Sequence, residues 1–132
     1  MIIVDTSIWI DVLKDKTGIS VAKFRKRVEG EVIVFNRFVQ LELLQGAKNE
    51  TEWKNLYDYL ETQYYLETKE NTWSQAAKIY YDLRKTGITI RSSIDCCIAQ
   101  IAIENQALLL HKYKDFTKIA LIRPLMNEFF RF

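Results

Sequence analysis

With 132 residues, the chain has the usual length of one domain, and we treat residues 1–132 as a single unit. Hydrophobic residues make up 48% and charged residues 27%, with one proline and four glycines, which excludes disordered, collagen-like and low-complexity proteins. The 19 basic and 17 acidic residues leave a net charge of +2, so the overall charge neither requires nor excludes a nucleic-acid partner.

In the first half of the chain, short apolar runs alternate with segments of helical periodicity. The β-branched run at residues 2–4 predicts a strand covered on both faces, as in a parallel sheet. Short polar residues after each apolar run can cap the helix that follows. The predicted elements are a strand at 2–4, a helix capped by Thr6 or Ser7 and running through Leu13, a helix from Ser20 to Gly30, a strand at 32–35, a helix from Asn36 to Gly46, and a helix at 49–61.

The second half continues this alternation. Residues 94–104 have the most apolar helical pattern of the chain, with Ser92 or Ser93 as the predicted cap. The other predicted elements are a short strand at 64–67, a helix from Asn71 to Gly87, a strand at 107–110, a short segment at 115–119 and a last strand at 120–122. Strands that alternate with helices from end to end predict one domain with a three-layer α/β/α fold and a mainly parallel central sheet.

The cysteines and the opening residues bear on the cellular compartment. Cys96 and Cys97 are adjacent, and neighbouring cysteines cannot form an ordinary disulfide without strain. We therefore expect a protein of the reducing cytoplasm. The chain opens with MIIVDTSIWI, which has neither a basic start nor an apolar run of about 18 residues. We expect no signal peptide and no membrane span.

Four carboxylates occupy positions that solvated acids normally avoid. Asp5 and Asp115 each follow a predicted strand, and ligands of open α/β sheets gather at the carboxyl ends of strands. Glu42 and Asp95 lie on helices beside apolar positions. Each acid also has an ordinary interpretation. Asp5 and Asp115 can cap helices, the helix dipole favours Asp95 in a first turn, and Glu42 can extend to water from a helix edge.

Taken together, the four acids predict a metal site. Carboxylates held close together repel one another unless a cation neutralises them. Sites built from oxygen ligands alone favour hard cations such as Mg²⁺ or Mn²⁺. A metal held in this way can bind a phosphodiester, deprotonate water for in-line attack and stabilise the leaving oxygen. The chemistry that we expect is metal-dependent phosphodiester hydrolysis.

Four sequence motifs contain these acids and occur in a familiar order. They are Ile3-Val4-Asp5-Thr6-Ser7 with Trp9 following, Glu42-Leu43-Leu44-Gln45-Gly46, Asp95-Cys96-Cys97-Ile98-Ala99 and Lys114-Asp115-Phe116. With these motifs the chain resembles, over almost its whole length, the PIN-domain ribonucleases, and in particular the VapC-type toxins of prokaryotic toxin–antitoxin pairs. The resemblance implies an Mg²⁺- or Mn²⁺-dependent endoribonuclease that acts as the toxin of a type II pair.

The resemblance also implies a role for each acid. Asp5, Glu42, Asp95 and Asp115 would form the catalytic and metal-binding set, and Asp5 and Asp95 are the favoured direct ligands. Glu42 would orient or deprotonate water, and Asp115 would complete the site through a water molecule.

Residues around the acids have supporting roles under the same resemblance. Thr6 and Ser7 would be hydroxyls that hold Asp5 in position. Tyr113 stands where many relatives have Asn or Asp, which bears on the placement of Asp115 and on a second metal. His111 ends its strand, and we expect it to be structural or to face RNA, because a metal can activate water without it.

The expected substrate is single-stranded or loop RNA. An acidic site repels RNA unless cations surround it. The candidate RNA-contacting cations are Lys14, Lys16, Arg37, Arg91, Lys112 and Lys114, of which Arg91, Lys112 and Lys114 flank the acids in the sequence. Trp9 and Tyr113 can stack on unpaired bases or pack inside the protein.

The partners expected from the resemblance are a second copy of the chain, as a homodimer, and a VapB-like antitoxin whose segment lies across the active-site groove. An aromatic-rich region can form that interface or pack in the core. It consists of Trp53, Tyr57, Tyr59, Tyr64 and Tyr65.

Other functions stay open at this point. One is a PIN-type nuclease that processes RNA without an antitoxin, and another is a non-catalytic RNA-binding module of the same fold. Loss of one acid would indicate the binding module, and all four acids are present. A flavodoxin-like binding domain has the weakest support, because the sequence contains no glycine-rich phosphate loop.

Overall fold

The computed structural model describes all 132 residues and contains one central sheet of four strands. The strands, in chain order, are β1 (Ile2–Val4), β2 (Ile33–Val34), β3 (Leu108–His111) and β4 (Asn127–Phe129). They lie in the order β2-β1-β3-β4, and every neighbouring pair is parallel. Because all the strands run the same way, their carboxyl ends meet at one edge of the sheet, where ligands of such folds bind.

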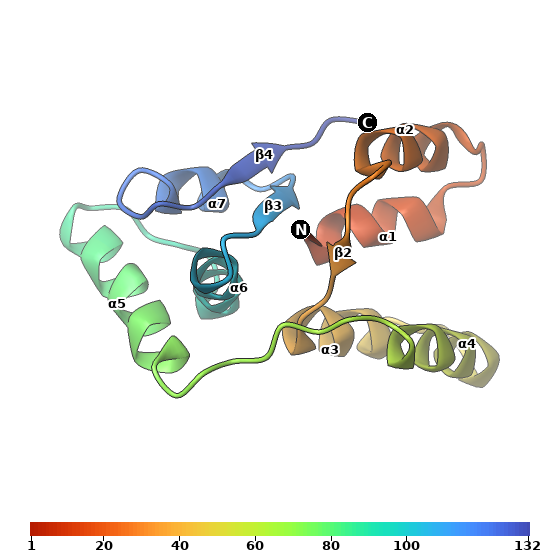
Figure 1. Cartoon of the computed structure of the whole chain (residues 1–132), viewed down its shortest axis with the longest axis horizontal. Helices are drawn as coiled ribbons and strands as arrows, with labels where there is room; N and C mark the ends of the chain where they lie inside the picture. The colour runs from red at the N-terminus through yellow and green to blue at the C-terminus, as the bar shows by residue number, and fades with distance from the viewer.

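Seven helices cover the two faces of the sheet (Figure 1). They are α1 (Thr6–Lys14), α2 (Ile19–Val28), α3 (Arg37–Gln45), α4 (Glu50–Glu61), α5 (Thr72–Lys85), α6 (Ser93–Glu104) and α7 (Lys114–Ile119). In Figure 1, α5, α6 and α7 lie on one side of the strands and α1 and α2 on the other. The predicted three-layer α/β/α fold with a parallel sheet is confirmed. The longest helix, α5, has 14 residues, and no helix has the length and hydropathy to cross a bilayer.

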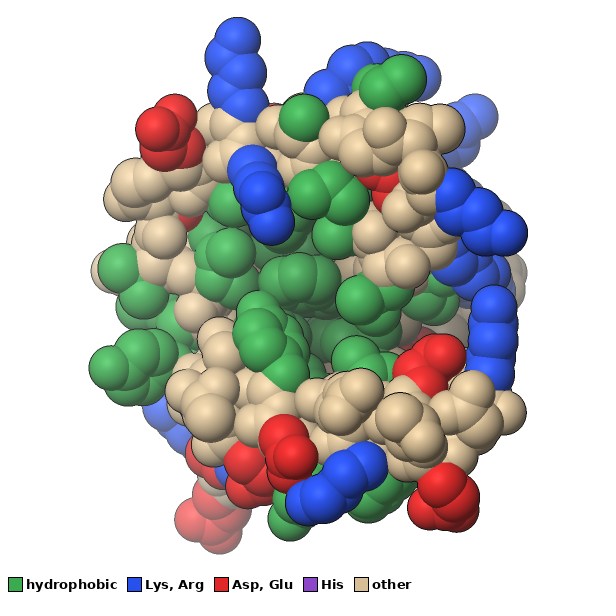
Figure 2. All heavy atoms as spheres, turned by 90° about the vertical axis from the view of Figure 1, so that its right-hand side faces the viewer, with side chains coloured by type: hydrophobic (Ala, Val, Ile, Leu, Met, Phe, Trp, Pro, Cys, Tyr) green, Lys and Arg blue, Asp and Glu red, His purple; other side chains and the backbone are tan.

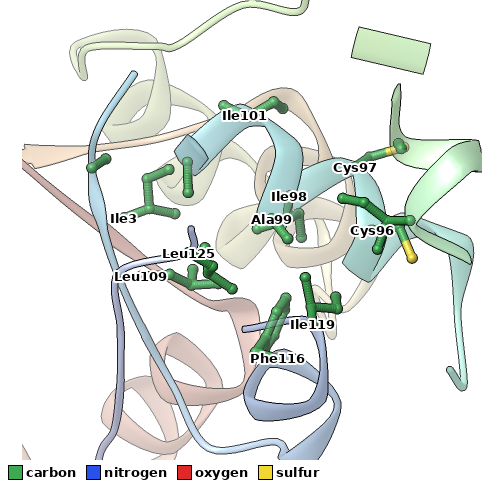
Figure 3. Packing of buried hydrophobic residues seen from close by; sticks show 14 of the residues in the cluster. Ile3, Cys96, Cys97, Ile98, Ala99, Ile101, Leu109, Phe116, Ile119 and Leu125 are labelled. Carbon is green, nitrogen blue, oxygen red and sulfur yellow. The ribbon is translucent and has the colours of Figure 1, made fainter. Parts of the chain in front are cut away.

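Alternating side chains of the central strands pack into two separate cores, one on each face of the sheet. Ile3 of β1 and Leu109 of β3 belong to a cluster of 17 buried residues that includes side chains of α5, α6 and α7. Figure 3 shows this core, with Ile98 of α6 facing the strands. Ile2 and Val4 point the other way and belong to a cluster of 11 buried residues with α1, α2 and α3. The β1 strand is therefore buried on both faces, as its apolar sequence predicts.

Polar side chains at the starts of the helices set where each helix begins. Asn36 Oδ1 accepts a hydrogen bond from the N–H three residues on, at 3.0 Å, and Ser92 Oγ accepts one from the N–H two residues on, at 3.1 Å. Both caps are confirmed. The predicted cap of α1 by Thr6 or Ser7 is wrong, because the capping side chain is Asp5, which accepts from the Ser7 N–H.

Two predicted strands are wrong. Residues 64–67 form only an isolated bridge, between Tyr65 and Phe35, and no continuous ladder. Residues 120–122 are turns that extend α7, since the N–H groups of residues 121 and 122 each donate to a carbonyl three residues back, at 3.1 Å. The last strand, β4, follows Pro124 and pairs with the outer side of β3.

Candidate active site

The four predicted acids lie at or behind the carboxyl edge of the sheet. Asp5 directly follows β1 and starts α1, and Glu42 lies in the middle of α3. Asp95 is in the first turn of α6, and Asp115 is in the first turn of α7. The sheet order places β1 beside β3, so the segments that follow these two strands start at the same edge.

Asp5 is buried, with 3% of its surface exposed. Its Oδ2 accepts hydrogen bonds from the backbone N–H of Ser7 at 3.2 Å and from the Ser7 hydroxyl at 2.6 Å. The protein donates no hydrogen bond to Oδ1. Ser7 therefore contacts Asp5 as predicted, and it fixes the orientation of the carboxylate while one oxygen remains available.

Thr6 does not hold Asp5, contrary to the sequence prediction. Its hydroxyl donates to Glu42 Oε1 at 2.9 Å, although the two residues lie 36 positions apart. Thr6 is buried, and Glu42 is half-buried. The bond joins α1 to α3 and holds the Glu42 carboxylate next to the end of β1.

The environment of Asp95 shows that the acids share one region. Its side chain is 8% exposed. Burial raises the pKa of Asp95 to about 6, the nearby guanidinium of Arg91 opposes this rise, and the negative charges of Asp5, Asp115 and Glu42 add to it. Asp95 therefore lies within electrostatic reach of the three other acids, and its carboxyl is mostly ionised at neutral pH.

Asp115 is held from two sides. Its Oδ2 accepts a hydrogen bond from the backbone N–H of Arg91 at 2.9 Å, and its Oδ1 lies 3.4 Å from Nζ of Lys118. The sequence motifs do not single out Lys118, although its position three residues after Asp115 on a helix is the spacing of a side-chain pair. The first contact ties α7 to the segment that precedes α6.

His111 has a structural position, one of the two roles that the sequence predicts for it. It is fully buried, its Nε2 pairs with Asn127 Oδ1 at 2.9 Å, and its Nδ1 accepts the N–H of Tyr113 at 3.2 Å. Burial lowers the pKa of His111, so the ring is neutral and links β3 to β4. Tyr113 is half-buried, and the guanidinium of Arg91 lies 4.0 Å from its ring centroid.

The donor set fits a hard divalent cation, although no three His, Cys, Asp or Glu side chains are grouped tightly enough to hold one ion. Mg²⁺ is commonly bound by one or two carboxylates, and water and substrate oxygens complete its shell. Asp5 and Asp95 suit this mode, because each is buried and each has one carboxylate oxygen that accepts no hydrogen bond from the protein. Direct binding by Asp5 and Asp95 stays a prediction, as do the roles of Glu42 and Asp115.

Comparison with known proteins decides the family. The model of the PIN domain matches residues 2–121. The chain belongs to the PIN-domain family. This confirms the resemblance that its four acidic motifs indicate, and it agrees with the parallel sheet and its acidic carboxyl edge.

Two curated relatives of this PIN domain are similar over its whole length. The VapC ribonuclease Mb1587 of Mycobacterium bovis is 31% identical over 134 aligned positions, which cover 99% of this chain and 100% of the relative. The ribonuclease VapC11 of Mycobacterium tuberculosis has the same identity and the same coverage. The insertions and deletions that separate this chain from these relatives are therefore small.

Solved structures share the fold of this PIN domain. A chain of VapBC-1 from nontypeable Haemophilus influenzae superposes with a TM-score of 0.78 at 25% identity, covering 98% of each chain. A chain of VapBC2 from Rickettsia felis, bound to a promoter DNA fragment, superposes with a TM-score of 0.77 at 18% identity, covering 99% of this chain and 100% of its own. The second likeness bears on the fold alone.

A hydrophobic groove lies between α1 and α4 of the PIN domain. It has a volume of about 790 Å³ and is lined by Trp9 and Leu13 of α1, Leu43 of α3, and Leu56 and Tyr59 of α4. Figure 2 shows this face, with hydrophobic side chains in a hollow and charged side chains around it. The sequence prediction did not include this groove, because its walls come from segments about 50 residues apart.

A second cavity, of about 720 Å³, continues the groove toward the acids. It shares Leu13, Leu43 and Leu56 with the first cavity, and Glu42 also lines it. Charged residues of both signs line it, with Lys14, Lys16 and Lys48 beside Asp15, Glu42 and Glu52. The groove therefore passes from an apolar part to a part of mixed charge that includes a candidate catalytic residue, Glu42.

The predicted RNA-contacting cations differ in how they are engaged. Lys114 is exposed and forms no ion pair, so it is free to bind phosphate. Lys112 pairs with Asp11 of α1, which limits its role. Arg91 contacts the acids themselves, at Asp95 and Asp115. Of the three, Lys114 is the simplest electrostatic contact for RNA.

Proposed function

We propose that this PIN domain is a metal-dependent endoribonuclease and the toxin of a type II toxin–antitoxin pair. The observation that carries the proposal is the placement of four acids at or behind the carboxyl edge of the parallel sheet, with Asp5, Glu42 and Asp115 close enough to the buried Asp95 for their charges to help raise its pKa. Such a cluster is costly for folding, and a divalent cation would relieve it. Two full-length relatives named as ribonucleases support the same reaction class.

Asp5 and Asp95 are the residues that would hold the ion. Bound Mg²⁺ or Mn²⁺ would supply Lewis-acid stabilisation of the phosphodiester and a lowered pKa for water. Ser7 keeps the Asp5 carboxylate in one orientation, through bonds to a single oxygen. Burial keeps both carboxylates away from bulk water, which strengthens their electrostatic interactions.

Glu42 would accept the proton of the attacking water. A general base must be held within hydrogen-bonding reach of the proton that it takes. The Thr6 hydroxyl holds one oxygen of Glu42 and leaves the other, Oε2, without a protein donor. Asp115 would complete the site through water, and Arg91 and Lys118 limit its movement.

Single-stranded or loop RNA is the proposed substrate. Lys114 offers a free positive charge beside the acids, and the half-buried ring of Tyr113 directly precedes it at the start of α7. Bases that are not paired can stack on such a ring, whereas the bases of a duplex are already stacked. The two cysteines are free and buried, which suits action in the cytoplasm.

A VapB-like antitoxin is the proposed partner, and the groove between α1 and α4 is the surface that would receive it. The structural neighbours from H. influenzae and R. felis are named as VapBC complexes. The groove suits the apolar face of a helix, and its charged end includes Glu42, so an occupant would reach the active site. Of the predicted aromatic interface residues, Tyr59 lines the groove, whereas Trp53 and Tyr57 stack on each other elsewhere on α4. We also propose that the chain acts as a homodimer.

Cleavage of a mixed set of structured RNAs tests the activity. The purified chain is incubated with Mg²⁺, Mn²⁺ or EDTA, beside an Asp95→Ala variant and an Asp58→Ala variant as an exposed acidic control. We expect discrete cuts that require metal, vanish in Asp95→Ala and persist in Asp58→Ala. Absent cleavage, with RNA binding intact and no metal binding by calorimetry, would instead support a non-catalytic RNA-binding module. A neighbouring small reading frame that encodes a DNA-binding antitoxin would separate a toxin from an RNA-processing nuclease that has no such partner.

A further inference from the structure

Arg91 contacts three residues of the candidate active site. It lies in the segment between α5 and α6, and its Nη2 is 3.3 Å from Asp95 Oδ2. Its backbone N–H donates to Asp115 Oδ2 at 2.9 Å, and its guanidinium lies 4.0 Å from the ring centroid of Tyr113. No other cationic side chain pairs with Asp95. One residue therefore supplies the positive charge closest to a predicted metal ligand.

The two contacts from Arg91 to the acids differ in kind. The bond to Asp115 comes from the backbone, so it survives any change of the side chain except proline. The contact to Asp95 joins a single nitrogen to a single oxygen at 3.3 Å, which is long for a charge-assisted hydrogen bond. The Arg91 side chain is also 55% exposed. The guanidinium can therefore leave Asp95 without disturbing the core.

Tyr113 gives the guanidinium a second anchor. Arginine over an aromatic face is stabilised by cation–π attraction and by stacking, and neither requires Asp95. After it leaves Asp95, the side chain can stay on the Tyr113 ring at the rim of the site. From that position its N–H groups suit a phosphate of RNA, since a guanidinium matches phosphate geometry.

We infer that Arg91 is a resident counter-cation of the acidic site, and that its guanidinium competes with a divalent cation for Asp95 and moves away from this carboxylate when the cation binds. The inference rests on the proposed function, because it requires Asp95 to be a metal ligand. Two cations that compete for one carboxylate repel each other, so Arg91 lowers the metal affinity that the four acids alone would have. When displaced, Arg91 changes from a neutralising group into an RNA-binding group.

Calorimetric titration of Mn²⁺ into the full chain, without RNA, tests this inference. Arg91→Gln removes the charge and keeps the backbone bond to Asp115, and we expect it to bind Mn²⁺ on the order of tenfold more tightly than the unchanged chain. The gain should shrink as salt screens the charges. Arg91→Lys keeps a positive charge and should stay within about threefold of the unchanged chain. Arg25→Gln makes the same change in net charge on an exposed, unpaired residue of α2 and should change nothing.

Different results would contradict the role of Arg91 and the proposed metal site. Mn²⁺ binding that is equal or weaker in Arg91→Gln, with an unchanged melting temperature, would overturn the counter-cation role. An equal gain in Arg25→Gln would also overturn it, because the effect would then come from net charge. If neither the unchanged chain nor any variant binds Mn²⁺, the proposed metal site is wrong, and the role inferred for Arg91 is wrong with it. In cleavage assays, we further expect Arg91→Gln to raise KM for RNA, because the variant lacks the guanidinium that would contact a phosphate.

Discussion

At the scale of single residues, Asp95 carries a charge in a place that disfavours one. Burial raises its pKa to about 6, and the other acids of the site contribute in the same direction. The folded protein therefore binds more protons than the unfolded chain between the ordinary pKa of 3.8 and about 6. The stability linked to Asp95 is fully present below the ordinary value, falls as pH rises toward 6, and stays low above it. The same charge is what the proposed metal site needs.

Asp95→Asn should therefore stabilise the protein without added metal. We expect the free energy of unfolding to rise by about 1 to 3 kcal/mol at pH 8, because the buried charge is removed while shape is retained. The gain should disappear near pH 3, below the ordinary pKa of 3.8, where the carboxyl is mostly protonated in both folded and unfolded states. Urea unfolding in EDTA at the two pH values measures this difference. Asp58→Asn, in an exposed pair with Lys54, is the control and should change little. A gain of equal size at both pH values would contradict a charge origin.

At the scale of secondary-structure elements, α4 and α6 differ most in how much of each helix is buried. Residues 95–102 of α6 are all buried, and the helix packs against α5, α7 and β3. In α4 only Leu60 is buried, and α3 is the main element that α4 contacts. The stacked pair Trp53 and Tyr57 stabilises α4 from within, at a centroid separation of 5.2 Å. Local stability follows buried contacts, so we expect α4 to detach more easily than α6.

Leu60→Ala should release α4 and leave the rest of the fold intact. Leu60 is fully buried, and loss of a buried leucine side chain commonly costs about 2 to 5 kcal/mol. Hydrogen exchange followed by mass spectrometry measures the result. We expect faster exchange in residues 50–61 and unchanged exchange in α6, while Leu56→Ala, at a half-buried position of the groove, should have a smaller effect. Faster exchange of α6 in Leu60→Ala would show instead that α4 belongs to the global folding unit.

At the scale of the whole molecule, the last residues of the chain pack against elements that are distant in the sequence. Arg27 of α2 makes two hydrogen bonds of 2.8 Å to the carboxylate of Glu128 in β4. Phe130 adds a buried ring to the core shared with α1 and α2, and Asn127 pairs with His111. These contacts hold the edge strand β4 against β3 and against the opposite layer of helices.

Arg27→Gln should lower the stability of the folded state by an amount that depends on pH. Hydrogen bonding to Arg27 lowers the pKa of Glu128, so the pair stabilises the folded state above the ordinary pKa of 4.5 and loses this contribution as pH falls below it. We expect a loss of about 1 kcal/mol at pH 7, because the pair is partly exposed, and little loss near pH 3. Thermal unfolding of Arg27→Gln beside Arg25→Gln measures it. Equal losses in the two variants would contradict a specific role for the Arg27–Glu128 pair.

Many of the strands and helices follow from local chemistry that the sequence alone shows. The run at residues 2–4 has to be buried on both faces because it offers no polar face, and the apolar pattern of α6 leads to the same result. Asn36 and Ser92 start helices because a short polar side chain can accept the N–H groups that no carbonyl of the helix reaches. The four acids are also visible, because each interrupts an apolar segment or follows a strand.

Tertiary structure alone decides which residues meet. Thr6 bonds Glu42 and not Asp5, and the Arg91 backbone holds Asp115, because the sheet order brings distant segments to one edge. The strand at the end of the chain is β4 and not residues 120–122, because strand pairing depends on a partner that lies elsewhere in the sequence. Sequence therefore determined the fold class and the identity of the acids, which depend on local composition and periodicity. Their partners depend on hydrogen bonds and charges across long separations, which only the folded chain specifies.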